Sequence, residues 1–276
     1  MNNENRQNST NNINWYPGHM AKTKRQIIED LKLIDIVVEV LDARIPISSQ
    51  NPDVREYTKE KKKIMILNKS DLANENETKK WVKYFNKQGM SAIITDANIG
   101  KGISEVIAEI KKMARENQDK YINKGRIGRS IRVLILGIPN VGKSSFINRI
   151  TKKSSAQVGN RPGVTRQKQW IRLAEGIELM DTPGVLWPKF ESEEVALNLA
   201  YTGTIKDDIL EKIEIAFRLL KYLIENYEDN VIERYKLDKQ DIDNIMNQEI
   251  EENDKIYDIM KLIAKKRGAI ISGRKN

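Results

Sequence analysis

The sequence of 276 residues has no cysteine and only one histidine, His19. Without cysteine the chain forms no disulfide and no thiolate metal site, which is typical of proteins in a reducing compartment. It also lacks any apolar run of about 18 residues, the length that a transmembrane helix needs. The polar stretch over 1–13 lacks the apolar segment of a secretory signal. These absences lead us to expect a cytoplasmic protein with no membrane partner.

Acidic residues are too few to balance the basic ones. The formal net charge is +9 and the sequence pI is about 9.4, which favours an acidic partner such as RNA or DNA. Lysine, asparagine and isoleucine are abundant throughout the chain, as an A/T-biased coding sequence would also produce. The charge alone therefore leaves both interpretations open.

Strand-like and helix-like patterns alternate over most of the chain. β-Branched or apolar runs such as Ile36–Leu41 are each followed by a polar loop, and segments with helical spacing of apolar residues lie between them. The helices expected here cover 21–34, 76–89 and 103–116. This alternation predicts an α/β fold built on a doubly wound, mostly parallel sheet.

The spacing of the apolar residues changes near Phe190. From about Glu191 strand patterns stop, and helical spacing continues to about Lys266. We therefore expect a disordered leader over 1–13, an α/β domain over 14–190 and a smaller all-helical domain over 191–276.

A phosphate-binding pattern lies between a predicted strand and a predicted helix. The stretch GIPNVGKS, Gly137–Ser144, matches G-x-x-x-x-G-K-[ST]. In this pattern backbone N–H groups and the positive helix end face the α- and β-phosphates, Lys143 neutralises the β- and γ-oxygens, and the Ser144 hydroxyl binds Mg²⁺. The residues expected at the phosphates are Asn140, Val141, Gly142, Lys143, Ser144 and Ser145. The alternative is an ordinary strand–turn–helix with a chance Gly-Lys-Ser.

Two further segments supply what such a loop needs. DTPG, which begins at Asp181, follows a predicted strand. We expect Asp181 to hold Mg²⁺ through its water shell and the Gly184 N–H to sense the γ-phosphate. Thr165, in RPGVT, lies between the two motifs and is expected to bind Mg²⁺ in the triphosphate state, although threonine is common in loops of every kind.

The stretch NKSD, Asn68–Asp71, follows another buried run and predicts selection of guanine. A carboxylate at Asp71 accepts hydrogen bonds from guanine N1–H and N2–H₂, whereas adenine would leave it unpaired, at a cost that excludes ATP. Asn68 is expected at the other edge of the base, the Lys69 stem on its face and the Ala97 N–H at guanine O6. The residues expected at the base are Asn68, Lys69, Ser70, Asp71, Asp96 and Ala97. Taken alone, NKSD is also compatible with a polar turn.

The order of the motifs is unusual, because in ordinary small GTPases NKxD follows the phosphate-binding loop and here it comes first. The carboxyl ends of strands in a doubly wound sheet share one edge, so the site assembles in either order, and we infer a circular permutation. This arrangement resembles the YlqF-type circularly permuted GTPases over about 14–273. The motifs that carry the resemblance are WYPGHMAK, DARIPISSQNP, NKSD, GIPNVGKSSFIN, RPGVT, DTPGVLWP, LAYTGTIKD and KKRGAIISG.

The resemblance implies a circularly permuted P-loop G domain that binds GTP and Mg²⁺ and hydrolyses GTP. It implies as partners the precursor of the large (50S) ribosomal subunit and its rRNA, with the GTP state coupling binding and release. We expect the ribosome to stimulate hydrolysis and the protein to be a monomer away from it. The segment after DTPG leads into the helical domain, so we expect GTP to change protease sensitivity around 186–194.

Hydrolysis needs a group that orients water, and the position after DTPG, where many GTPases have glutamine, is Val185. His19 is the only imidazole available and follows a mobile Pro-Gly turn. The resemblance also implies that this histidine is catalytic. The alternative is that His19 belongs to an RNA-contact patch with the residues Trp15, Tyr16, Lys22, Lys24 and Arg25.

Two further expectations concern a second cation and the contact with RNA. Asn140 resembles the asparagine that lets some GTPases use K⁺ beside the phosphates, so K⁺ is a tentative second cation. Lys265, Lys266 and Arg267 are expected to contact RNA, although basic surface runs are usually only solvated. The main alternative function is a non-catalytic RNA-binding module that needs GTP for its fold.

Overall fold

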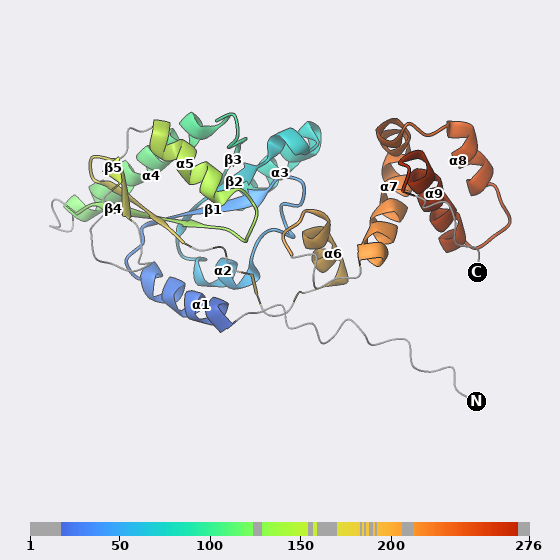
Figure 1. Cartoon of the computed structure of the whole chain (residues 1–276). Coiled ribbons are helices and arrows are strands. Elements are labelled where there is room, and N and C mark those ends of the chain that lie inside the picture. Colours follow the sequence, from blue (N-terminus) through green and yellow to red (C-terminus); the bar gives the residue numbers. More distant parts are fainter. Residues whose placement is uncertain are drawn as a thin grey trace. The chain divides into compact units, whose positions relative to one another are not determined.

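The computed structural model describes residues 18–123, 129–153, 157–158, 170–182, 192–205 and 212–269, together with residues 184, 186, 187 and 190. The chain forms two compact units, Met1–Ile205 and Lys206–Asn276 (Figure 1). The first unit contains the sheet, and the secondary-structure elements of the second unit are all helices within its described residues.

A single sheet of seven strands forms the centre of the first unit within the described residues. Its order is β3-β2-β1-β4-β7-β6-β5, and all neighbours from β3 to β7 are parallel, while β6 and β5 join antiparallel. This confirms the predicted α/β class with a mostly parallel sheet. The strands are β1 (Ile36–Asp42), β2 (Lys62–Asn68), β3 (Ser91–Ile94), β4 (Ile131–Leu136), β5 (Gln157–Val158), β6 (Trp170–Ala174) and β7 (Ile177–Asp181).

The strand order reverses between β1 and β4. On one side of β1 lies β2, and β3 lies beyond β2. On the other side β1 pairs with β4, and β7 lies beyond β4. Ligands of open α/β sheets bind outside the carboxyl ends of the strands at such a reversal. The residues that end the parallel strands are Asp42, Asn68, Ile94, Leu136 and Asp181.

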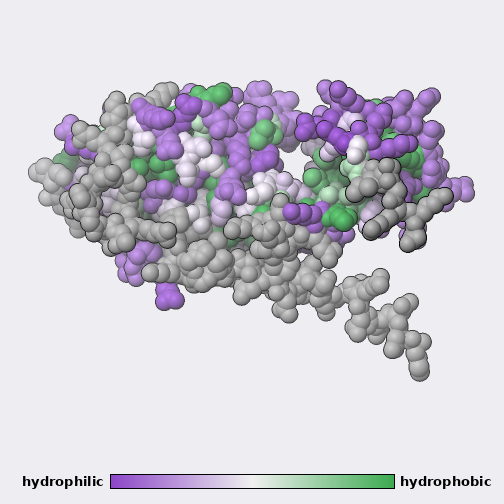
Figure 2. Space-filling model, in the orientation of Figure 1, coloured by the Kyte–Doolittle hydropathy of each residue, from purple (hydrophilic) through white to green (hydrophobic). Residues whose placement is uncertain are grey.

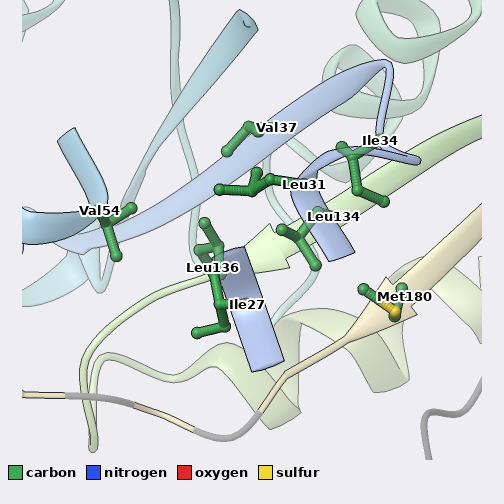
Figure 3. Close-up of a cluster of buried hydrophobic side chains, with 8 residues drawn as sticks. All are labelled: Ile27, Leu31, Ile34, Val37, Val54, Leu134, Leu136 and Met180. Atoms are coloured by element: carbon green, nitrogen blue, oxygen red, sulfur yellow. The ribbon is translucent and has the colours of Figure 1, made fainter. Parts of the chain in front are cut away.

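One face of the sheet is covered by α1 (Gly18–Leu31) and α2 (Pro52–Tyr57) (Figure 1). Helical spacing brings Ile27 and Leu31 of α1 onto this face, where they pack with Val37, Leu134 and strand neighbours (Figure 3). Fully burying one such side chain stabilises a fold by about 1.5–3 kcal/mol. The residues of this cluster are Ile27, Leu31, Ile34, Val37, Val54, Leu134, Leu136 and Met180.

The opposite face is covered by α4 (Ile103–Ile122) and α5 (Lys143–Lys153) (Figure 1). Side chains alternate along a strand, so Val38 and Val40 point away from Val37 toward these helices. Ile103, Ile110 and Phe146 of the two helices are fully buried. Every residue of β1 is buried, as expected for a parallel strand covered on both sides.

The helix α3 (Glu75–Lys87) begins at a clear capping signal. Asn74 accepts hydrogen bonds from the backbone N–H groups of Asn76 and Glu77. The helix ends before Gly89, whose φ of +78° is the left-handed conformation that glycine adopts most readily. Its Phe85 packs on Leu41 and Met65.

The first unit ends beyond the boundary that the sequence predicted near Phe190. It includes the helix α6 (Glu193–Tyr201), because Leu199 and Ile205 are buried in it and Asn198 donates a hydrogen bond to Ser48 Oγ at 3.0 Å. A change in periodicity locates the end of strand patterns, but it does not show which unit the next helix joins.

The second unit contains α7 (Lys212–Tyr235), α8 (Lys239–Met246) and α9 (Glu252–Lys266). Their apolar stripes meet in a separate core, and α7 is interrupted at Tyr227, where φ is −146° and ψ is 39°. The buried residues of this core are Phe217, Leu220, Ile224, Val231, Leu237, Ile242, Ile256 and Ile259.

Hydrophilic side chains are spread over both units on the face shown in Figure 2, with apolar ones scattered between them. Among the described helices, none is both long enough and apolar enough to cross a membrane.

Candidate nucleotide-binding site

The phosphate-binding loop runs from the carboxyl end of β4 to the first residue of α5, Lys143. Asn140 and Gly142 have φ values of +62° and +88°. A Cβ on Gly142 would lie 2.4 Å from Asn68 Nδ2, and one on Gly137 would lie 2.8 Å from the Val40 carbonyl oxygen. Positions 137 and 142 therefore require glycine. The free N–H groups at the start of α5 lie at the carboxyl edge of the sheet, where a nucleotide is expected.

Asn68 joins the NKSD segment directly to this loop. Its Nδ2 donates to the Val141 carbonyl oxygen at 2.8 Å, while its Oδ1 accepts from Thr95 Oγ1 and from the Ala97 N–H, both at 3.1 Å. The side chain is buried, so all three bonds lie in a low-dielectric environment. One amide thus fixes three loops that follow β4, β2 and β3.

Lys143 and Asp181 meet on the phosphate side of the site. Lys143 Nζ lies 2.6 Å from Asp181 Oδ1, with the lysine side chain buried and the carboxylate partly exposed. Ser144, in the first turn of α5, is exposed. A hydroxyl and a carboxylate are hard oxygen donors, and Mg²⁺ is usually bound through one or two such groups with water and phosphate oxygens. These residues therefore fit the ion expected there.

The DTPG segment approaches the phosphate-binding loop closely. Thr182 Oγ1 donates to the Ile135 carbonyl oxygen of β4 at 2.8 Å. A Cβ on Gly184 would lie 2.8 Å from the backbone nitrogen of Pro139. Only glycine allows this approach, which brings the backbone of Gly184 beside the loop as the sequence analysis expects of a γ-phosphate sensor.

The base-binding loop is held by backbone hydrogen bonds. Lys69 has a φ of +59°, and the Ser70 N–H donates to the Thr95 carbonyl oxygen at 3.1 Å. Asp71 is exposed in the short 3₁₀ helix Ser70–Leu72. The hydroxyl of Ser70 is buried and has no hydrogen-bond partner among the described residues.

Two residues of the TDA segment are hydrogen-bonded within the protein. The Ala97 N–H, expected at guanine O6, donates to Asn68 Oδ1. The Asp96 carboxylate accepts from the N–H groups of Asn98 at 2.8 Å and Ile99 at 3.4 Å, so it shapes its own loop. Short polar side chains often bond to backbone N–H groups two or three residues on, and Asp96 follows this pattern.

A charged cluster that was not predicted from the sequence lies beside NKSD. Asp42, the last residue of β1, is buried and accepts hydrogen bonds from Arg44 Nε at 2.9 Å and Arg44 Nη2 at 2.7 Å. Lys69 Nζ lies 3.1 Å from Asp42 Oδ2. Burial opposes ionisation of Asp42, but the hydrogen bonds of Arg44 and the charge of Lys69 outweigh it and lower the pKa of the carboxyl. A signal existed in the DAR tripeptide at the end of an apolar strand.

Asn140 contacts the loop that follows α6. Its Nδ2 donates to the Gly203 carbonyl oxygen at 2.7 Å. The amide nitrogen of Asn140 is thus bonded within the protein, and the amide oxygen is the atom of this side chain that could ligate K⁺. This contact links the phosphate-binding loop to the end of the first unit.

Several predicted residues lie outside the described part of the chain. These are Trp15, Tyr16, Thr165 and Val185, and the side chains of His19, Lys22 and Lys24. At the end of α9, Lys265, Lys266 and Arg267 are exposed, with the guanidinium of Arg267 5.4 Å from the centre of the Tyr235 ring.

Comparison with known proteins agrees with this geometry. A family model described as a 50S ribosome-binding GTPase matches residues 132–262. The chain is 45% identical to the Ribosome biogenesis GTPase A of Bacillus cereus over 261 residues, covering 95% of this chain and 84% of that protein.

Solved structures show the same similarity. The crystal structure of GNP-bound YlqF from T. maritima is 27% identical with a TM-score of 0.56, covering 90% of this chain and 95% of that one. A GDP-bound YlqF structure is 30% identical with a TM-score of 0.54, covering 88% of this chain and 96% of that one.

Proposed function

This chain belongs to the ribosome biogenesis GTPase A family, and on that premise we propose that it acts in the cytoplasm as an assembly factor for the large (50S) ribosomal subunit, whose precursor it binds and releases according to the bound nucleotide. It is a GTP-binding protein of ribosome biogenesis that hydrolyses GTP to GDP and phosphate. The observation that carries the proposal is the bonding of Asn68 to the Val141 carbonyl oxygen, because it joins the guanine motif to the phosphate motif in one site.

The phosphate side supplies positive charge where negative charge gathers during phosphoryl transfer. We assign Lys143 to the β- and γ-oxygens, the N–H groups at the start of α5 to the α- and β-phosphates, and the Gly184 N–H to the γ-phosphate. Ser144, Asp181 and Thr165 would hold Mg²⁺, which neutralises charge on the β- and γ-oxygens when bound. Lys143 pairs with Asp181 at 2.6 Å, so binding of a triphosphate requires this lysine to exchange one anionic partner for another.

The base side supplies selection. We assign the exposed carboxylate of Asp71 to guanine N1–H and N2–H₂ and the stem of Lys69 to the ring face. Asn68 supports this loop from behind through its bond to Thr95. The Ala97 N–H reaches guanine O6 only if its bond to Asn68 Oδ1 is shared or exchanged when the nucleotide enters.

We assign the orientation of the attacking water to His19, because Val185 offers no hydrogen bond. The test compares His19→Ala with wild type for phosphate release in the presence of ribosomal subunits. A loss of at least about tenfold with unchanged GTP affinity supports a catalytic histidine, as general acid–base groups contribute about 10²–10⁴-fold. A normal stimulated rate of the variant would assign His19 to the RNA-contact patch.

Coupling to the ribosome requires that the nucleotide state reach the far end of the first unit. The bond between Asn140 and Gly203 places that end in contact with the phosphate-binding loop, and Asn198 of α6 is bonded to Ser48. These contacts support a switch in which GTP changes the segment over 186–194 and the chain that follows it. The exposed cations at the end of α9 are the residues that we assign to rRNA.

The experiment that tests this function is co-sedimentation with large ribosomal subunits in a non-hydrolysable GTP analogue and in GDP. We expect retention with the analogue and release with GDP, and multiple-turnover phosphate release with the same particles. Equal retention in both states would leave the alternative, a GTP-dependent RNA-binding module without a catalytic cycle. Hydrolysis rates in K⁺ and Na⁺ at matched ionic strength test the tentative K⁺ site at Asn140.

A further inference from the structure

We propose that Asp42 is a positioning residue for guanine binding, which acts by holding the Lys69 ammonium so that the Lys69 stem is fixed where the purine ring packs. Arg44 supports it by fixing the Asp42 carboxylate. This inference rests on the assignment of NKSD to guanine, and it adds residues from a different strand to the base site.

The contacts place Asp42 directly behind the base-binding loop. Asp42 and Asn68 are partners in the register of β1 and β2, and the Ala43 N–H donates to the Asn68 carbonyl oxygen at 2.8 Å. Lys69, the next residue after Asn68, turns back in a left-handed conformation, which brings its Nζ to 3.1 Å from Asp42 Oδ2. The ammonium therefore lies against β1, and the four-carbon stem spans the distance from the NKSD backbone to it.

Asp42 itself is held rigidly. Its side chain is 1% exposed, and Arg44 binds both carboxylate oxygens, through Nε and Nη2, while the Arg44 N–H donates to Oδ1 at 3.1 Å. Its backbone N–H donates to Ser49 Oγ at 3.0 Å, and Ser49 in turn donates to the Pro46 carbonyl oxygen. A carboxylate fixed by a bidentate guanidinium offers its second cation a single position.

This fixation matters because lysine is a flexible side chain. Ordering a free lysine side chain costs rotamer entropy, and this cost would lower the affinity for the nucleotide if the stem became ordered only on binding. With the ammonium already held by Asp42, the stem is ordered beforehand, and the affinity for the base is correspondingly higher.

The same cluster reaches the carboxylate that selects guanine. The positive charge of Arg44 also interacts with the Asp71 carboxylate, after its stronger interaction with Asp42. The alternative is that the three residues form only a structural ion pair. The two interpretations differ in one measurable respect, which is whether the loss of Asp42 acts through Lys69 and on the base alone.

The test is a double-mutant cycle measured with two ligands. The dissociation constants of GDP and of inorganic pyrophosphate are determined by calorimetry, in Mg²⁺, for wild type, Asp42→Asn, Lys69→Met and the double variant. We expect each single substitution to weaken GDP binding by about tenfold, with pyrophosphate binding unchanged, because each one releases the Lys69 stem from its position at the base and leaves the phosphate side intact. The double variant should also lose only about tenfold, because each substitution breaks the same contact.

Lys79→Met is the matched control, because Lys79 forms an exposed ion pair with Glu75 on α3, and it should change neither dissociation constant. Losses of GDP affinity that multiply in the double variant, or an equal loss for pyrophosphate, would overturn the inference. If Asp42→Asn does not fold, Arg44→Lys is used in its place. Arg44→Lys alone is expected to weaken GDP binding about threefold, and Arg44→Lys combined with Lys69→Met should bind GDP no more weakly than Lys69→Met alone. Failure of the wild type to bind GDP would instead refute the proposed function.

Discussion

Lys143 Nζ lies 2.6 Å from Asp181 Oδ1, an ion pair between the phosphate-binding loop and DTPG across a separation of 38 residues. Each partner has an assigned role toward the nucleotide, the lysine toward phosphate oxygens and the aspartate toward Mg²⁺. The pair keeps a buried ammonium compensated before the nucleotide arrives, since an uncompensated buried charge would be costly.

The two partners should respond differently to Mg²⁺. We expect Lys143→Met to raise the Kd for GTP by at least about 30-fold with or without Mg²⁺, because it removes a buried charge that pairs with phosphate. Asp181→Asn should instead abolish most of the increase in affinity that Mg²⁺ gives. Titration of a fluorescent GTP analogue with Mg²⁺ or with a chelator measures both effects. Lys112→Met on the exposed side of α4 serves as a control. If Asp181→Asn behaves as Lys143→Met does, the division of roles is wrong.

Substitutions at Asp71 and Asp96 should have different effects on the preference for guanosine nucleotides. Asp71→Asn is expected to reverse the preference for guanosine over xanthosine nucleotides by more than about tenfold, because an amide donates where a carboxylate accepts. Asp96→Asn should leave the preference unchanged, since the Asp96 side chain accepts from the Asn98 and Ile99 backbone. Competition binding with GDP and xanthosine diphosphate distinguishes them. A reversed preference in Asp96→Asn would show that this carboxylate contacts the base after all.

Removal of the Asn68 side chain should destabilise the whole site. Asn68→Ala leaves the Val141 carbonyl, the Thr95 hydroxyl and the Ala97 N–H without their buried partner, which we expect to lower the free energy of unfolding by about 2–4 kcal/mol. Urea unfolding measures the change. Asn76→Ala, at an exposed position of α3, should stay within about 0.5 kcal/mol of wild type. An equally small effect at position 68 would mean that the loops are held by other contacts.

Glu39 predicts an unusual dependence of stability on pH. Burial within β1 raises its pKa to about 7, only partly opposed by Lys63, Gln50 and Arg55. Between pH 4.5 and about 7 the folded state therefore keeps the Glu39 proton. The unfolded state, in which the pKa of Glu39 has its ordinary value of 4.5, has already released that proton. The stabilisation is present below pH 4.5 and is lost as pH rises to about 7, by roughly 3 kcal/mol.

Chemical unfolding at pH 5 and pH 8 measures this effect. Glu39→Gln is expected to remove the loss between these pH values, so it should be the more stable chain at pH 8. Met65→Leu, a neighbouring core change without a titratable group, should shift stability equally at both pH values. A parallel pH profile for wild type and Glu39→Gln would contradict the raised pKa.

Much of the site could be predicted because its chemistry lies in local patterns at strand ends. Parallel strands bring their carboxyl ends to one edge, so NKSD, GIPNVGKS and DTPG had to meet if the strands were correctly identified. Glycine at positions 137, 142 and 184 is explained by the close approaches that the structure shows.

The features that could not be predicted depend on pairing between distant elements. Nothing in the run IVVEVL shows that Glu39 stays buried, because its neighbours Lys63 and Gln50 come from other segments. The contacts of Asp42 with Lys69 and of Asn140 with Gly203 likewise require the β1–β2 register and the position of α6. In contrast, α2 had a local signal, Asn51 followed by Pro52, that was overlooked.

The ends of two helices also differ between the prediction from the sequence and the structure. The expected helix over 103–116 continues to Ile122 as α4, and the one expected over 21–34 is α1, Gly18–Leu31. The residues after Glu116 explain the extension of α4, because glutamine and lysine are good helix formers and continue a helix readily.

The reversal of strand order between β1 and β4 also has a consequence for biosynthesis. A chain made from its N-terminus completes β1, β2 and β3 first, and in the finished sheet these three are contiguous. The nucleotide site needs both parts of the chain, because NKSD follows β2 whereas the phosphate-binding loop joins β4 to α5. We therefore expect a newly made molecule to bind GDP or GTP only after translation has added β4 and α5.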